Sequence, residues 1–288
     1  MRTVSIPPRF EDWRDTAREL LAAQVPPEEL LWSDGGEHSD LFGELELPPP
    51  TARPPKVSKA FLDLARSAAC HRDERRWALL YRLLWRMTHG GEPHLLSLAT
   101  DLELRQVQRW TKAVGRDIHK LHAFVRFRKV DEDPETGREG FVAWYEPDHL
   151  TLRLGAPFFR KRFSNMNWSI LTPDECAHWD GKALRFTDGV NRDAAPEGDD
   201  LDELWRTYYR SIFNPARLKV KMMQSQMPRK FWKNLPEAEI IEELIKGSSG
   251  QVQQMLDTEE RPAKPAPNNA YLKSLHEMNR KQAEEKRS

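Results

Sequence analysis

The sequence predicts an α+β protein in which an antiparallel sheet of about five strands packs against several helices. Apolar residues recur at helical spacing up to about residue 122, then alternate with polar residues between Phe124 and Phe186. Helical spacing returns after residue 200. Runs of helices and strands that are segregated along the chain in this way are typical of α+β proteins.

Residues 1–55 are expected to form an N-terminal helical segment followed by a linker. Within residues 8–32, apolar side chains around Trp13 and Leu20 predict an amphipathic helix, and Pro26-Pro27 would begin a second short helical stretch that runs through Trp32. Residues 33–55 are acidic and rich in proline, which favours an extended, solvated chain. We therefore expect this region to be weakly attached to the rest of the protein.

The main α+β domain is expected to cover residues 56–250. Ser58 can cap its first helix, and apolar stripes predict two more helices at residues 74–88 and about 94–122. Period-two alternation then predicts five strands, at residues 124–130, 141–145, 169–171, 177–179 and 183–186.

Turn residues and the C-terminal pattern complete this outline. Asp180-Gly181 is typical of a tight turn between the last two strands, because glycine accepts the positive φ that the turn requires. Helices are expected again between residues 201 and 247. Residues 251–288 are rich in charge and proline, and we expect them to form a disordered tail.

The composition excludes several classes of protein. No segment approaches the roughly 20 apolar residues of a membrane span, and the start of the chain lacks an apolar signal run, so a cytoplasmic location is expected. The 45 Lys+Arg residues balance the 45 Asp+Glu residues, which excludes a uniformly basic surface but leaves room for local patches. Cys70 and Cys176 lie far apart and form no CxxC pair, so neither a disulfide framework nor a zinc knuckle is predicted.

Familiar catalytic motifs are also missing from the sequence. It contains no phosphate-binding loop, dinucleotide fingerprint, nucleophile elbow, HExxH helix or deaminase zinc pair. We therefore predict no cofactor and no metal, and whether the protein is an enzyme stays open.

The strongest electrostatic signal is the segment 210–234, which contains seven basic residues and no acidic one. The basic residues are Arg210, Arg217, Lys219, Lys221, Arg229, Lys230 and Lys233. Trp232 and other aromatic residues lie among them, and cations beside aromatic rings suit phosphate neutralisation and base stacking. A solvated helical face with its apolar side packed inward is the structural alternative.

The first predicted hairpin offers a second candidate surface. If its strands pair symmetrically, Arg126, Arg128 and Trp144 share one face, which can hold a phosphate backbone and stack an unpaired base. Arg160 and Arg162 would extend this positive surface. An arginine beside a tryptophan on a sheet is also a common cation–π contact that needs no ligand, and a register slip of one residue would separate these groups.

Histidines supply the candidates for catalysis. Asp117, His119 and His122 lie near the predicted end of a helix, and His149 and His178 lie near strand ends. Together these five residues could form a metal or acid–base site. A hydrogen-bonded structural role is the alternative for each histidine.

Four segments of the chain resemble a bacterial family of unknown function whose members are described as DNA metabolism proteins. These segments are LYRLLWR at 80–86, VGRDIHKLHAFVRF at 114–127, FVAWYEPDH at 141–149 and WRTYYRSIFNPAR at 205–217. The resemblance covers roughly residues 1–250. Family members occur alone, beside a DNA-repair radical-SAM protein, or fused ahead of a UdgX-type uracil-DNA glycosylase.

The resemblance implies a DNA-repair context but no particular reaction. No glycosylase residues can be carried over, so we expect no base excision by this chain alone. The matched segments contain Arg126, Trp144, His119, His122 and Arg217, which the chemical arguments also select.

Three functions are compatible with the sequence. The first is a DNA-binding accessory protein that presents single-stranded or damaged duplex DNA to a separate repair enzyme, such as a radical-SAM or uracil-DNA glycosylase-type protein, or docks with that enzyme. The second is an enzyme that acts on nucleic acid through the histidine and aspartate residues. The third is a scaffold whose segment 222–232, rich in methionine and aromatic residues, binds a partner protein.

Overall fold

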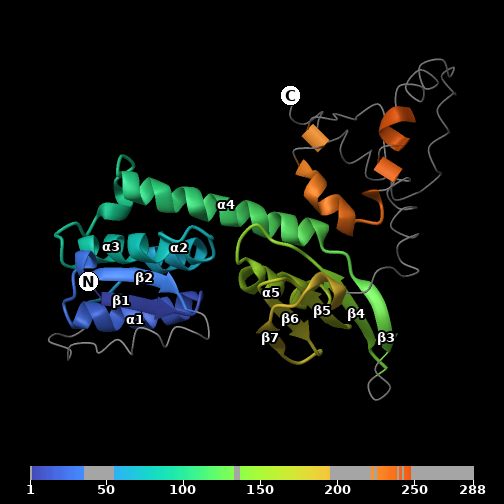
Figure 1. The fold of residues 1–288 in the computed structure, drawn as a ribbon, viewed down its shortest axis with the longest axis horizontal. Coiled ribbons are helices and arrows are strands. Elements are labelled where there is room, and N and C mark those ends of the chain that lie inside the picture. Colours follow the sequence, from blue (N-terminus) through green and yellow to red (C-terminus); the bar gives the residue numbers. More distant parts are fainter. Residues whose placement is uncertain are drawn as a thin grey trace, which may run out of the picture.

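The fold is α+β, as predicted (Figure 1). The computed structural model describes residues 2–35, 55–132, 137–194, 222–223, 226–238, 240–241 and 243–247. Two hydrophobic cores organise these residues, one in each half of the molecule. Predictions for 36–54, 201–221 and 251–288 lie outside the described residues.

The N-terminal half begins with a strand, a helix and a second strand. Strands β1 (Arg2–Ile6) and β2 (Leu30–Asp34) pair in parallel, and α1 (Phe10–Ala22) connects them. The predicted helix at α1 is confirmed, but the predicted helical stretch up to Trp32 is wrong. A single 3₁₀ turn ends at Glu29, and β2 follows because Leu30 is buried beside the strand partner β1.

Helices α2 (Lys59–Ala69) and α3 (Arg76–Thr88) complete the first core. The Ser58 side chain accepts a hydrogen bond from the Phe61 backbone at 3.3 Å, which confirms the predicted cap. Trp13 of α1 stacks on Trp77 of α3 with ring centroids 6.4 Å apart. Residues on both sides of the expected boundary at residue 55 therefore belong to one continuous hydrophobic core.

Helix α4 (Leu102–Phe124) runs along both halves of the molecule (Figure 1). Its side chains Val107 and Trp110 belong to the first core, whereas Leu121 and Phe124 belong to the second. Asp101 caps the helix by accepting the Leu104 N–H at 2.8 Å. One rigid element thus connects the two cores.

The second core contains a mixed sheet of five strands in the order β3-β4-β5-β6-β7. The strands are β3 (Arg128–Glu132), β4 (Glu139–Trp144), β5 (Asn167–Leu171), β6 (Glu175–Trp179) and β7 (Leu184–Asp188). Neighbouring strands are antiparallel except β4 and β5, which are parallel because helix α5 (Leu152–Arg162) connects them as a crossover. Gly181 has φ +84°, which confirms the predicted turn between β6 and β7.

A C-terminal 3₁₀ helix (Arg229–Asn234) packs on the second core through the buried side chain of Phe231. The Phe231 ring stacks on Tyr145 at 5.5 Å. None of the helices in the described ranges has the length and hydropathy needed to cross a bilayer.

Removing the Asp34 carboxylate should destabilise the first core. Arg76, which is 1% exposed, pairs with Asp34 at 2.5 Å, and the Trp77 indole donates to the same oxygen at 2.7 Å. We expect Asp34→Ala to lower the free energy of unfolding by about 2–4 kcal/mol, somewhat less than for a fully buried pair because Asp34 is partly exposed.

Chemical denaturation measures this loss, with Asp15→Ala as the control. Asp15 pairs with Arg14 in the open, so its removal should cost less than about 1 kcal/mol. Equal losses in the two variants would contradict the role given to Asp34.

Candidate nucleic-acid interface

Arg126 is engaged within the protein. It lies between α4 and β3, and its guanidinium pairs with Glu237 at 2.7 Å and donates to the Ala123 carbonyl at 2.7 Å. The two charged side chains are only 14% and 3% exposed. Arg126 and Glu237 lie 111 residues apart in the sequence. Their ion pair therefore attaches the C-terminal segment to the end of α4.

The Trp144 ring is buried rather than offered to a base. Arg128 does pair with Val142, as symmetrical pairing of the hairpin predicts. Trp144 is only 8% exposed, however, and its indole N–H donates to Glu146 at 2.9 Å. Sequence periodicity places residues on a face of a strand, but it does not tell which chain segments cover that face.

The described lysines of the predicted basic segment are paired with acids. Lys230 pairs with Asp148, and Lys233 pairs with Glu146 at 2.8 Å. Burial raises the pKa of both carboxyls and is the largest single effect, but hydrogen bonds and the charge of nearby cations together outweigh it, so each pKa lies below its usual value. These residues line a cavity of about 400 Å³ that holds charges of both signs.

Of the other predicted residues in that segment, Trp232 and Arg229 are described in the structure and the remaining basic residues are not. Trp232 donates its indole N–H to the Met227 carbonyl at 3.0 Å, and the Arg229 guanidinium lies 5.5 Å from its ring centre. Arg217, Lys219 and Lys221 lie outside the described residues.

The structure places the candidate histidines in separate environments. His119 is exposed on α4, and the His122 ring is hydrogen-bonded to the Gly155 carbonyl at 3.1 Å. His178 uses both ring nitrogens, with Ser169 at 2.8 Å and Thr187 at 2.9 Å.

No hydrogen bond, ion pair or ring contact within the described ranges joins His122, His149 and His178. The same part of the chain contains no group of three His, Cys, Asp or Glu side chains able to hold a metal ion.

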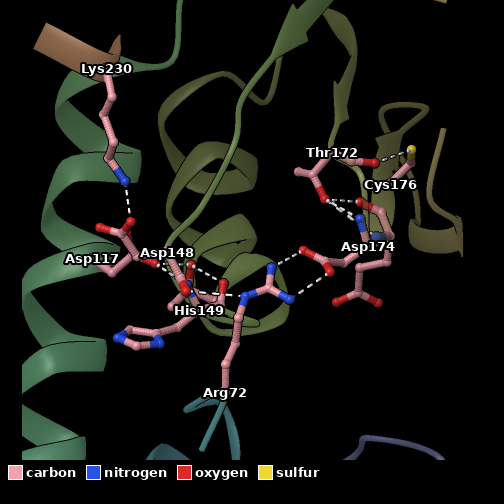
Figure 2. Close-up of polar contacts among 10 residues, drawn as sticks. Arg72, Asp117, Asp148, His149, Thr172, Asp174, Cys176 and Lys230 are labelled. Carbon is pink, nitrogen blue, oxygen red and sulfur yellow. Dashed lines mark hydrogen bonds and ion pairs between the residues drawn. The ribbon is translucent and has the colours of Figure 1, made fainter. Parts of the chain in front are cut away.

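Asp117 and His149 meet at the junction of the two halves (Figure 2). Asp117 is buried, and its Oδ2 accepts the backbone N–H of His149 at 2.9 Å and the Thr151 hydroxyl at 3.2 Å. The His149 ring lies against His71, which follows α2, with centroids 4.2 Å apart. Asp117 thus shapes the loop before α5 through its contacts with the backbone and a hydroxyl.

Arg72 ties the halves together beside this junction (Figure 2). It donates to the Asp148 carbonyl at 3.1 Å and to the Asp174 carboxylate at 2.9 Å. The loop between α2 and α3 is thereby bound to both the β4–α5 loop and the β5–β6 turn.

The exposed face of α4 carries a row of positive charge that the sequence analysis did not single out. Eight residues of the helix are exposed, and none of them is acidic. They are Leu102, Arg105, Arg109, Lys112, Gly115, Arg116, His119 and Ala123. We call Arg105, Arg109, Lys112, Arg116 and His119 the α4 basic row. Within the described ranges, no ion pair joins any member of this row to a carboxylate.

The two acidic residues of α4 face elsewhere. Asp117 is buried at the junction, and Glu103 pairs with Arg82 at 2.7 Å and with Arg86 at 3.0 Å. The spacing of four, three, four and three residues along the row was visible in the sequence, and it could have been found by examining the side of the helix opposite Val107 and Val114.

A cavity of about 450 Å³ lies over the C-terminal half of the row. Its lining contains four basic side chains and no carboxylate, and consists of Lys112, Gly115, Arg116, His119, Lys120 and Gln226. Gly115 lies in mid-helix, where glycine costs about 1 kcal/mol relative to alanine. Nothing lies within 4 Å of the position that a Cβ would take, so packing among the described residues does not require this glycine. Its open backbone allows close approach of a ligand.

Helix α5 adds positive charge at its last turn. Arg160, Lys161 and Arg162 are exposed there. Cations at this end of a helix also complement its dipole. On the hairpin surface that Arg160 and Arg162 were predicted to extend, Arg126 is paired with Glu237 and Trp144 is buried.

Comparison with known families identifies one match. Residues 74–237, more than half of the 288-residue chain, match the model of DUF4130, a domain of unknown function. The match includes α4, α5 and the five-stranded sheet. No curated protein and no solved structure matches the chain.

Removal of Arg126 should weaken the fold through Glu237. The substitution Arg126→Ala would leave a carboxylate that is 3% exposed without its cation. We expect the free energy of unfolding to fall by about 3–5 kcal/mol, whereas Arg185→Ala, which breaks an exposed pair with Asp180, should cost less than about 1 kcal/mol. Denaturant titration compares the variants, and full stability of Arg126→Ala would refute the structural role.

Acid should destabilise the protein partly through His71. Burial, together with the nearby charge of His149, lowers the pKa of His71 to about 4, although Asp73 opposes the shift. Its Nδ1 accepts the Asp73 backbone N–H at 3.0 Å, and protonation would abolish that bond. Below its ordinary pKa of about 6.5, the unfolded chain gains a proton that the folded protein does not bind, so stability falls between about pH 6.5 and 4.

The variant His71→Asn keeps an acceptor but does not titrate. Melting temperatures at pH 7 and pH 5 should therefore differ less for this variant than for the natural protein. All other titrating groups are common to both, so identical pH dependence would show that His71 contributes nothing.

Proposed function

We propose that this protein, which belongs to the DUF4130 family, binds nucleic acid along the α4 basic row. The observation that carries the proposal is the exposed face of α4, which bears four lysine or arginine residues and a histidine but no acid. Phosphate neutralisation by such cations supplies most sequence-independent affinity for nucleic acid.

The regularity of the row favours a polymer over a small anion. Arg105 and His119 lie about 21 Å apart along the axis, and successive members are about 4.5–6 Å apart at 1.5 Å per residue. Regularly spaced cations suit a polymer that carries one negative charge on each of its repeating units, as a nucleic acid does on each nucleotide. The cavity around Gly115 would receive a phosphate group of that ligand.

Another helix of the same protein shows what a merely solvated face contains. The exposed side of α1 carries Glu11, Arg14, Asp15, Arg18 and Glu19, so both signs are interspersed. Arg14 pairs with Asp15 there, and Glu11 pairs with Arg66 of α2. Mixed charge is sufficient for solubility. The uniform sign on α4 therefore needs another explanation, and a polyanionic ligand supplies one.

The likeness to DNA metabolism proteins gives this activity its context. In our proposal the protein is a cytoplasmic accessory factor of DNA repair that presents DNA to, or docks with, a separate enzyme of the radical-SAM or uracil-DNA glycosylase type. A catalytic role gains no support from the described histidines, because no contact within the described ranges joins His122, His149 and His178 into one site.

Neutralising part of the row should reduce the salt dependence of binding. The double variant Lys112→Ala/Arg116→Ala removes two phosphate contacts, so the slope of log affinity against log salt for an oligothymidine probe should fall by about 1.4, at about 0.7 per phosphate on single strands. Fluorescence anisotropy over a salt series measures the slope.

The matched control is Arg18→Ala/Lys182→Ala, which removes the same net charge from exposed sites on α1 and on the β6–β7 turn. Its slope should equal that of the natural protein. Absence of salt-dependent binding by the natural protein, or equal slopes in the two double variants, would refute the assignment to α4.

A further inference from the structure

We infer that the bound nucleic acid is single-stranded and that one of its bases stacks on Phe158. This inference rests on the proposed function, and it adds the type of strand and the residue that recognises it. Phe158 lies on α5 and is 43% exposed. Among the large apolar side chains that are exposed in the described part of the chain, it is the only aromatic one.

Two neighbouring rings hold Phe158 in place. One is His122 of α4, which stacks on it with centroids 4.2 Å apart and planes inclined by 26°. The other is Phe159, which is buried and meets it edge to face at 5.3 Å and 85°. The ring is therefore fixed before a ligand arrives, so little conformational entropy would be lost when a base stacks on it.

Phe158 also lies between two sources of positive charge. Its partner His122 is one helical turn from His119, the last member of the α4 basic row. Arg162 is one turn further along α5, where the exposed Arg160 and Lys161 also lie. A strand that follows α4 could continue past Phe158 toward the end of α5, with phosphates bound on either side of a stacked base.

The position of the ring on a helix surface selects for unpaired bases. In a duplex each base is already paired and stacked, and extruding one costs a few kcal/mol. A single strand offers its bases freely, and an aromatic ring beside a cationic track is the usual way of holding them. Stacking is possible with every base, so this contact predicts little sequence preference.

The test compares Phe158→Ala and Phe158→Trp with the natural protein, using an oligothymidine and a hairpin duplex as probes. Stacking on one aromatic ring corresponds to about fivefold to a hundredfold in affinity. We expect Phe158→Ala to lose affinity for oligothymidine in this range with an unchanged salt slope, because no charge is removed. Phe158→Trp should retain the affinity, and duplex binding should be weaker than oligothymidine binding and insensitive to either substitution.

Leu31→Ala is the matched control, since Leu31 is a comparably exposed apolar residue on β2, in the half of the molecule that contains the first core (Figure 1). It should bind as the natural protein does, and the melting temperatures of all variants verify that they fold. If Phe158→Ala binds oligothymidine normally, or weakens both probes equally, the inference is overturned while the proposed function stands. If the natural protein binds neither probe, the proposed function fails and the inference fails with it.

Discussion

The burial of one continuous helix in two hydrophobic cores is the constraint on which the rest of the structure depends. Val107 and Trp110 fix α4 in the first core, and Leu121 and Phe124 fix it in the second. Because both ends are held, the helix cannot turn about its axis. The same side therefore faces outward over its whole length, which aligns cations that lie up to 14 residues apart in the sequence.

Charge in this protein has to be interpreted in three dimensions. The acid-free segment 210–234 is conspicuous in the sequence, yet Lys230 and Lys233 find their counter-ions on the loop after β4. Helix α4 shows the reverse, because its sequence contains Glu103 and Asp117 and reads as mixed. Burial of Asp117 and the pairing of Glu103 with α3 remove both acids from the exposed face.

Local patterns predicted much of the fold and little of the site. The helices near 59–69, 76–88 and 102–124 were foreseeable from periodicity, since each buries an apolar stripe. Alternation located the five strands, but the first begins at Arg128 and not at Phe124, which still belongs to α4. Strand β1 was missed because it is short and pairs with a strand 28 residues later. Helix α5 was missed because it contains Gly155 and Pro157, and only burial of its apolar side in the second core overrides their poor helical propensity. Contacts such as Arg126 with Glu237 join distant segments and leave no local signal.

Because both cores contain side chains of α4, this helix cannot gain or lose even one residue between them. Each residue inserted into an α-helix rotates everything beyond it by about 100° and advances it by 1.5 Å. An insertion between Trp110 and Leu121 would thus swing one half of the protein around the other and divide the basic row between two sides of the molecule. The turns between strands can accept insertions or deletions, whereas α4 cannot. Relatives that keep this architecture should therefore align through α4 without gaps.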